Sequence, residues 1–177
     1  MTKPHFTQEQ LVQIAKLTDE DIERIDVCRG VQNKIGFAYQ LCYAKLFNRL
    51  PSQSPLEILK ELSTFVAIQL DLPQQQLQAY SLRQPTVSSH QEQIRNYLSL
   101  RKFDKYTEKI LREHIFQQAL QIQAIDPLLL LATEFLKQNR ILNPADDTLE
   151  RLIQPEREKA RKWPSTNIRA LGRHRVT

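Results

Sequence analysis

The sequence has very little glycine: only Gly30, Gly36 and Gly172 occur among 177 residues. Tight β-hairpin turns often need glycine at positions with positive φ, so this scarcity argues against a sheet-rich fold. Neither a GxGxxG nor a GxxxxGK(S/T) run is present, which excludes the glycine-rich loops that hold phosphate in nucleotide-binding proteins. Glutamine and leucine are abundant instead, and both favour helices.

Cysteine and long apolar runs are also scarce. Cys28 and Cys42 form no CxxC pair, and no histidine stands at a metal-ligand spacing from either, so we expect two reduced, buried thiols. The longest apolar run, 127–132, is far too short to cross a membrane, and no signal peptide is visible. We therefore expect a soluble, cytoplasmic protein without membrane contact.

No set of residues typical of a catalytic site stands out. The four histidines, His5, His90, His114 and His174, are scattered and lack the i, i+4 spacing of a helical metal site. The acidic stretch Asp19–Asp26 could hold a metal, but acidic residues also favour the first turn of a helix, which is our interpretation. We therefore predict that the chain is not an enzyme and needs no metal or cofactor.

Apolar residues recur at helical spacing along most of the chain, and no strand pattern competes. Thr7 and Gln10 resemble a capping box, and Ser54–Pro55 suits a helix start. Val27 is expected to face inward, and Pro155 is expected to break or kink the last helix. The predicted helices cover 7–17, 19–27, 32–48, 55–70, 73–80, 90–99, 105–124, 128–139 and 147–163.

We therefore predict an all-α fold of two small helical bundles with helix-turn-helix-like elements and a basic carboxyl-terminal tail. The segment Arg83–Val87 contains Pro85 and is predicted to be a linker. The first lobe then covers residues 1–82 and the second covers 83–163. Residues 164–177 show no apolar period, so we predict a loosely ordered tail.

Positive charge is concentrated in three places. Residues 1–150 hold 17 Lys and Arg against 18 Asp and Glu, whereas 151–177 hold eight against two. The stretch Arg29–Arg49 has four basic residues and no acidic one, and Arg83–Arg112 has a net charge of +4. Such stretches neutralise phosphates in DNA-binding proteins, although an ordinary charged helix face is the alternative. A helix that begins at Ser88–Gln91 would also offer polar side chains to base edges in the major groove.

One block resembles a known family. Asn33–Tyr43 is Asn-Lys-Ile-Gly-Phe-Ala-Tyr-Gln-Leu-Cys-Tyr, with Arg49 after five further residues. It resembles the signature block near the amino terminus of transposases of the Tn-three family. Further matches are Ile68–Leu70 with Tyr80, Arg83, Thr86 and His90, and the Leu-rich segment 126–135 followed by 141–152. The resemblance spans residues 7–163, with departures at Lys34, Asn48 and Val87, where Arg, Gly and Arg are usual.

The resemblance implies a role in transposition. In such transposases the amino-terminal region binds the terminal inverted repeats of the transposon through helix-turn-helix-like subdomains, and an acidic catalytic triad lies in a carboxyl-terminal domain that this chain lacks. It implies a bacterial, nucleoid-associated protein whose partners are double-stranded DNA and the transposase catalytic domain or another copy.

We predict DNA contacts in both lobes, with arginine and lysine on phosphates and His90, Gln91 and Arg95 on bases. The predicted contact residues are Arg29, Lys34, Arg83, Ser88, His90, Gln91, Arg95, Arg101, Lys102 and Lys105. The alternatives are a protein–protein module or truncated regulator of transposition, which an exposed apolar helix 128–135 would favour, and an enzyme in its own right. The target DNA sequence is not determined by the protein sequence.

Overall fold

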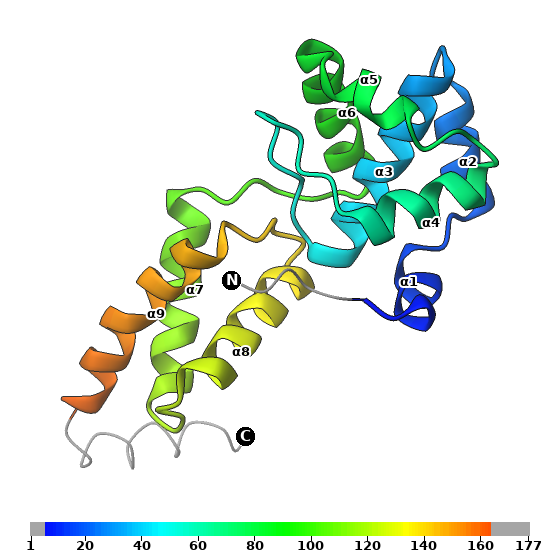
Figure 1. The fold of residues 1–177 in the computed structure, drawn as a ribbon. Helices are drawn as coiled ribbons and strands as arrows, with labels where there is room; N and C mark the ends of the chain where they lie inside the picture. Colours follow the sequence, from blue (N-terminus) through cyan, green and yellow to red (C-terminus); the bar gives the residue numbers. More distant parts are fainter. Residues whose placement is uncertain (1–5, 164–177) are drawn as a thin grey trace. The chain divides into compact units, whose positions relative to one another are not determined.

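Within residues 6–163, which the computed structural model describes, every regular element is an α-helix (Figure 1). Two isolated β-bridges also occur in this range, Gln53 with Leu56 and Arg101 with Ile141. The predicted all-α class is therefore confirmed. Tertiary contacts divide the chain into two compact units, unit 1 (residues 1–100) and unit 2 (residues 101–177), and each is described by itself.

Unit 1 is built around one buried helix. Its described part contains α1 (Gln8–Ala15), α2 (Asp19–Asp26), α3 (Val31–Phe47), α4 (Lys60–Leu70), α5 (Gln76–Ser81) and α6 (Gln84–Tyr97). The other five helices all pack against α3, and its residues from Ile35 to Ala44 are all buried. A helix that is apolar nearly all round is stable only when it is covered on every side, which explains its central place.

Unit 2 is a bundle of three helices in its described part: α7 (Lys105–Ala119), α8 (Ile125–Gln138) and α9 (Asp146–Arg161). Each packs against the other two around a core that includes Leu111, Leu128 and Ile153. The segment before α7 pairs with the segment after α8, because the backbone N–H of Arg101 donates to the carbonyl of Arg140 at 2.8 Å. Helix α9 continues through Pro155 without a break. The predicted basic tail, residues 164–177, lies outside the described residues.

Short polar side chains fix where several helices begin. Thr7 accepts a hydrogen bond from the backbone N–H of Gln10, and the Gln10 side chain accepts one from the Thr7 N–H, so the predicted capping box is confirmed. Thr18 with Asp21 and Asp104 with Thr107 form the same reciprocal arrangement at α2 and α7. Such a cap stabilises a helix by about 1 kcal/mol.

The predicted helix start at Ser54–Pro55 is wrong, because α4 begins only at Lys60. Residues 52–59 are tied to α3 in an irregular conformation instead. The hydroxyl of Tyr39 donates to the Glu57 carbonyl at 2.8 Å and accepts from the Leu59 N–H at 2.9 Å. A tertiary contact with α3 therefore outweighs the local preference for a helix start.

The predicted linker Arg83–Val87 is also wrong, because Gln84 to Val87 form the first turn of α6. Pro85 is compatible with this position, since the first turn of a helix needs no backbone N–H donor there. Val87 is fully buried against the core of unit 1. The two units consequently divide after Leu100, whereas the sequence placed the division ahead of Arg83.

None of the helices within residues 6–163 has the length and apolar content needed to cross a membrane.

Candidate nucleic-acid interface

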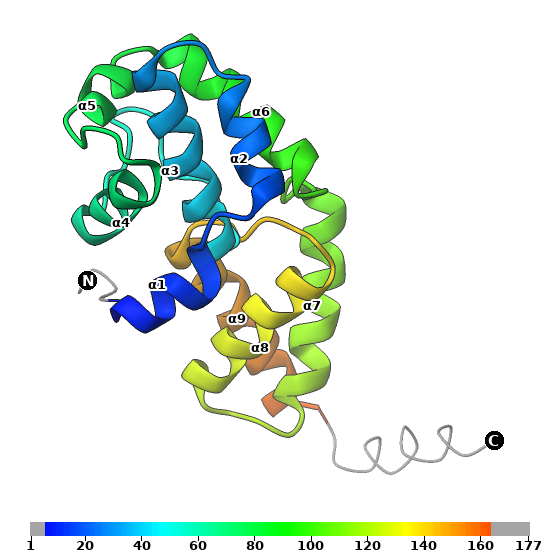
Figure 2. The same ribbon diagram turned by 90° about the vertical axis from the view of Figure 1, so that its right-hand side faces the viewer.

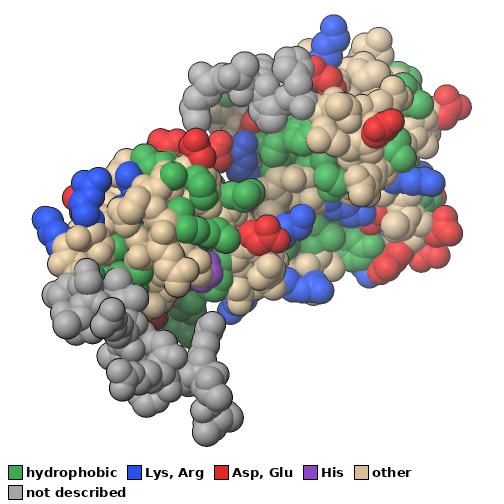
Figure 3. All heavy atoms as spheres, turned by 90° about the horizontal axis from the view of Figure 1, so that it is seen from below, with side chains coloured by type: hydrophobic (Ala, Val, Ile, Leu, Met, Phe, Trp, Pro, Cys, Tyr) green, Lys and Arg blue, Asp and Glu red, His purple; other side chains and the backbone are tan. Residues whose placement is uncertain are grey.

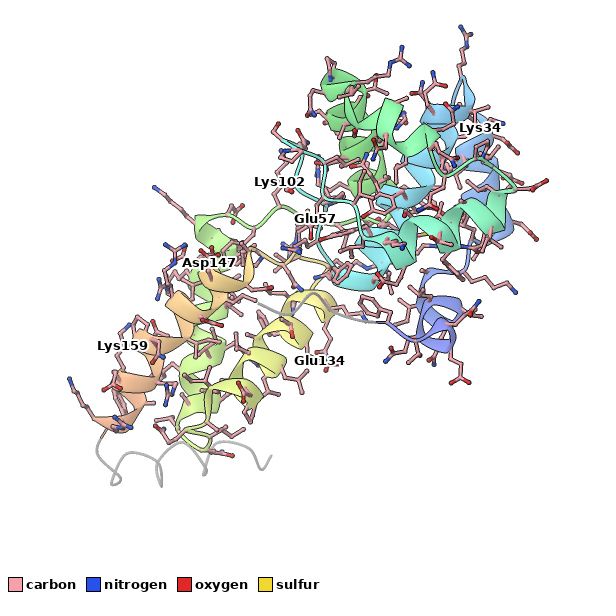
Figure 4. All side chains as sticks on the ribbon, in the orientation of Figure 1. Lys34, Glu57, Lys102, Glu134, Asp147 and Lys159 are labelled. Carbon is pink, nitrogen blue, oxygen red and sulfur yellow. The ribbon has the colours of Figure 1, made fainter. Side chains whose placement is uncertain are left out.

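Helices α3 and α6 begin at the same end of unit 1 (Figures 1 and 2). The amide of Asn33 in the first turn of α3 donates to the backbone carbonyl of Arg29 at 2.8 Å. Its oxygen accepts from the guanidinium of Arg83, the residue before α6, at 3.4 Å. Asn33 therefore joins two arginines that are 54 positions apart in the sequence. We call Arg29, Asn33, Lys34 and Arg83 the basic cluster, and Figure 4 labels Lys34 at this end of α3.

The basic cluster is accessible and positive. Arg29 and Arg83 are exposed, and neither forms an ion pair with another residue of the described range 6–163. Lys34 is about one-third exposed and pairs with Asp26 at 2.6 Å. No side chain caps the first turn of α3 or α6. Helix starts favour anions, so cations and two helix starts together can bind phosphate groups.

A buried polar network holds the starts of α3 and α6 together. The Gln40 amide of α3 donates to the Tyr80 hydroxyl at 2.6 Å and to the Val87 carbonyl at 3.3 Å. The Tyr80 hydroxyl also lies 2.9 Å from Nδ1 of His90. Burial lowers the pKa of His90, which favours the neutral form of its ring. Gln40 comes from α3 and Tyr80 from α5, and α6 supplies both Val87 and His90.

Gly36 permits this packing. A Cβ atom at position 36 would lie 2.3 Å from Cγ of Tyr80, far inside van der Waals contact. The block Asn33–Tyr43 that resembles the transposase signature therefore has a structural explanation. Gly36 admits the Tyr80 ring, Gln40 binds its hydroxyl, and Phe37 packs edge-on against His90 with ring centroids 5.2 Å apart.

Two of the predicted base-reading residues lie inside the unit. His90 and Gln91 are buried, and Gln91 donates to the Pro51 carbonyl at 2.8 Å while accepting from the Gln53 amide at 2.6 Å. The expectation that they begin a helix is wrong, because α6 begins at Gln84 and positions 90 and 91 fall on its inner face. Both side chains are therefore occupied by contacts within unit 1.

The remaining predicted residues of unit 1 are only partly available. Ser88 is exposed on α6, but it lies inside the helix instead of capping it. Arg95 is 22% exposed, and its guanidinium lies 3.8 Å from the Glu92 carboxylate. The structure therefore brings Arg83 together with Arg29 and Lys34, and it leaves Ser88 and Arg95 further along α6.

In unit 2 the predicted contact residues surround the start of α7. Lys102 and Lys105 are exposed, and Figure 4 labels Lys102 in the segment that leads into this helix. Arg101 is exposed too, and its guanidinium donates to the Asn139 carbonyl at 3.3 Å. Asp104, which caps α7, has a lowered pKa because the backbone and side chain of Thr107 hydrogen-bond to it. This acidic cap reduces the positive charge next to Lys102 and Lys105.

Sequence reasoning missed that most other basic residues of the two stretches are already paired. Lys45 pairs with Asp21, Arg49 bonds to the Tyr43 hydroxyl at 2.7 Å, and Arg112 bonds to the buried Glu156 at 3.2 Å. Figure 3 shows one face on which basic side chains alternate with acidic and apolar ones. Charge along the sequence therefore overstates the positive surface.

Asp21 is an acidic residue whose role the sequence concealed. It belongs to the stretch interpreted as a solvated helix start, but it is buried and also accepts from the Tyr97 hydroxyl of α6 at 3.0 Å. Burial raises the pKa of Asp21, but the hydrogen bonds from Lys45 and Thr18 outweigh that effect and leave the pKa lowered. The carboxylate therefore links α2, α3 and α6.

Cys28 and Cys42 form no disulfide; Cys42 is buried, as predicted, whereas Cys28 is only half-buried. Within residues 6–163, no group of three or more His, Cys, Asp or Glu side chains is arranged to hold a metal ion.

Comparison with known proteins finds similarity to several bacterial transposases. It is 29% identical over 159 residues to the transposase for transposon gamma-delta of Escherichia coli (strain K12), covering 87% of this chain and 16% of that protein. It is 27% identical over 142 residues to the transposase for transposon Tn1546 of Enterococcus faecium, covering 80% and 14%. For the transposase for transposon Tn501 of Pseudomonas aeruginosa the identity is 28% over 148 residues, covering 82% and 15%.

The chain thus spans about one-sixth of the length of these relatives, and the match lies in their amino-terminal part. The resemblance inferred from Asn33–Tyr43 is confirmed. A family model described as "Domain of unknown function (DUF4158)" matches residues 1–155. Because this match covers most of the 177 residues, the chain belongs to the DUF4158 family.

Proposed function

We propose that the chain binds double-stranded DNA in a sequence-specific way and recognises the terminal inverted repeats of a transposon, as the non-catalytic amino-terminal part of a transposase. The observation that carries this proposal is the basic cluster, where Asn33 joins Arg29 and Arg83 at the starts of two helices. Similarity to the amino-terminal part of transposases supports it. Strand cleavage then belongs to the five-sixths of those relatives that this chain does not match.

In this proposal α6 follows α5 after the short turn Leu82–Arg83 and lies in the major groove, as the second helix of a helix-turn-helix. Arg29, Lys34 and Arg83 contact phosphates beside the groove. Ser88 lies on the exposed side of α6, where a hydroxyl can bond to a base edge or a phosphate. Lys102 and Lys105 contribute phosphate contacts from unit 2.

A protein–protein module gains less support. The apolar helix α8 would favour it if exposed, but Leu128, Ala132 and Leu136 are buried in the core of unit 2. Leu130 is the one large apolar residue of α8 that is mostly exposed, at 66%. One leucine is normal for a protein surface and indicates no binding face.

The test has two stages. Duplexes that the purified chain retains are first selected from a random pool, and the enriched sequence is compared with inverted repeats in the DNA that flanks the gene. Binding of the enriched duplex is then titrated at several salt concentrations. If repeated selection enriches no sequence, or if enriched and random duplexes bind equally, specific recognition is refuted.

The basic cluster is tested by the double substitution Arg29→Ala and Arg83→Ala. Each phosphate contact contributes roughly one unit to the slope of log affinity against log salt, so the double variant should lower that slope by about two. Lys16→Ala with Lys60→Ala is the matched control, because it removes two exposed lysines that lie elsewhere in unit 1, after α1 and at the start of α4. An equal loss in the control would show that only net charge matters.

A further inference from the structure

Two aliphatic side chains at the end of unit 1 are exposed to an unusual degree. Val27, predicted to face inward, is 80% exposed at the end of α2, and Leu82 is 83% exposed at the end of α5. Val31, the first residue of α3, is 40% exposed. Exposure of large apolar side chains costs solvation free energy, so an apolar group that covered them would be bound favourably.

These residues lie beside the basic cluster. Leu82 directly precedes Arg83, and Val27 and Val31 stand two positions on either side of Arg29. Asn33 holds Arg29 and Arg83 together through its two hydrogen bonds. Each exposed apolar residue therefore adjoins an arginine of the basic cluster along the chain, in the segments 27–31 and 82–83.

We propose, on the basis of the proposed function, that Val27 and Leu82 contact the C5 methyl groups of thymines in the major groove. Thymine methyls are the apolar groups that duplex DNA presents in that groove, and they are read by apolar side chains. Cations that grip the adjacent phosphates would hold these side chains against the bases. Val27 and Leu82 each stand next to charged residues. This combination suits the major groove and its phosphates better than it suits an extended apolar surface of another protein.

The proposal makes Val27 and Leu82 specificity-determining residues. His90 and Gln91, the residues that the sequence suggested for base reading, are buried, whereas these two are free to touch bases. Their contacts favour a site that contains thymine at two positions. Burial of one methyl group contributes roughly 0.8 kcal/mol. Because about 1.4 kcal/mol corresponds to a tenfold change in affinity, each thymine contact should raise affinity by about fourfold.

The experiment replaces each thymine of the selected duplex by uracil, which removes only the methyl group. At two positions the replacement should weaken binding of the wild-type chain by about fourfold. The Val27→Ala variant should lose this preference at one position, and Leu82→Ala at the other. Ile68→Ala is the matched control, because Ile68 is 72% exposed on α4, away from the cluster, and it should keep both preferences.

Two results would overturn the thymine contacts. The wild-type chain could bind every uracil-substituted duplex as tightly as the thymine duplex, or the alanine variants could keep both preferences. A lower molar mass of the Val27→Ala, Leu82→Ala double variant in light scattering would instead assign the patch to an interface between copies and refute the inference. Even if the thymine contacts were refuted, loss of affinity in the Arg29→Ala, Arg83→Ala double variant would still support DNA binding. The proposed DNA binding and the proposed thymine contacts can therefore fail separately.

Discussion

Replacing Gly36 by alanine tests whether the contact between α3 and Tyr80 holds unit 1 together. The new Cβ would meet three atoms of the Tyr80 ring at 2.3–2.4 Å. Ordinary carbon contacts are about 3.5–4.0 Å, so the ring or the helix must move by more than about 1 Å. The ring has little freedom, because it is fully buried and its hydroxyl is bonded to Gln40 and lies against His90.

Two opposing effects decide the magnitude. Alanine favours a helix over glycine by about 1 kcal/mol. Overpacking a well-packed core costs about 1–3 kcal/mol and occasionally more, and a clash with three ring atoms belongs at the upper end. We therefore expect Gly36→Ala to lower the free energy of unfolding by about 2 kcal/mol. It should also weaken DNA binding, since α5 and the start of α6 must shift away from α3.

The assay is urea unfolding followed by circular dichroism, with Tyr80→Ala and the double variant measured alongside. Tyr80→Ala alone should cost about 3–5 kcal/mol because it leaves a large cavity. The double variant should be less destabilised than the sum of the two single variants by at least about 1 kcal/mol, since the clash is gone. A Gly36→Ala protein as stable as the wild type, or additive effects in the double variant, would refute the reasoning.

Two further predictions concern buried groups of unit 1. The pKa of Asp21 is lowered on folding, so its stabilising effect is complete above its unfolded value of about 3.9 and is lost as pH falls through its lower folded value. Asp21→Asn should lower the free energy of unfolding at pH 7 by about 3 kcal/mol, because it leaves Lys45 unpaired. Below pH 4, the urea midpoint of the variant should fall less steeply with decreasing pH than that of the wild type. Parallel acid profiles of the two proteins would exclude this role for Asp21. Burial raises the pKa of Cys42 to about 12. Iodoacetamide at pH 8 should therefore alkylate half-buried Cys28 but not Cys42 in the native protein, and it should alkylate both cysteines in urea. Modification of Cys42 in the native state, detected by mass spectrometry, would contradict its burial.

The sequence alone determined the helical class and most helix positions, because these depend on local properties. Apolar residues at helical spacing predicted a helix over 32–48, where the structure has α3, and Thr7 with Gln10 marked a helix start that needs no other part of the chain. The block Asn33–Tyr43 likewise indicated the relatives that the comparisons later found, because a resemblance depends only on residue order.

Tertiary structure decided which of the predicted site residues can act. The chain alone could not show that Tyr39 ties residues 52–59 to α3 or that Pro85 enters the first turn of α6. Because α6 begins at Gln84, His90 and Gln91 lie in the middle of the helix on its buried side. Contacts between distant residues set burial and pairing, so charge counted along the chain included Lys45 and Arg49, which are already bonded.

The basic cluster is likewise a product of folding. Arg29 and Arg83 are far apart in the sequence, and Asn33 bonds to both once Gly36 has let the Tyr80 ring pack against α3. A glycine in a helix is unfavourable by itself, so no local preference explains Gly36. The shape of the aromatic ring that covers it supplies the reason, and it is visible only when α3, α5 and α6 are assembled.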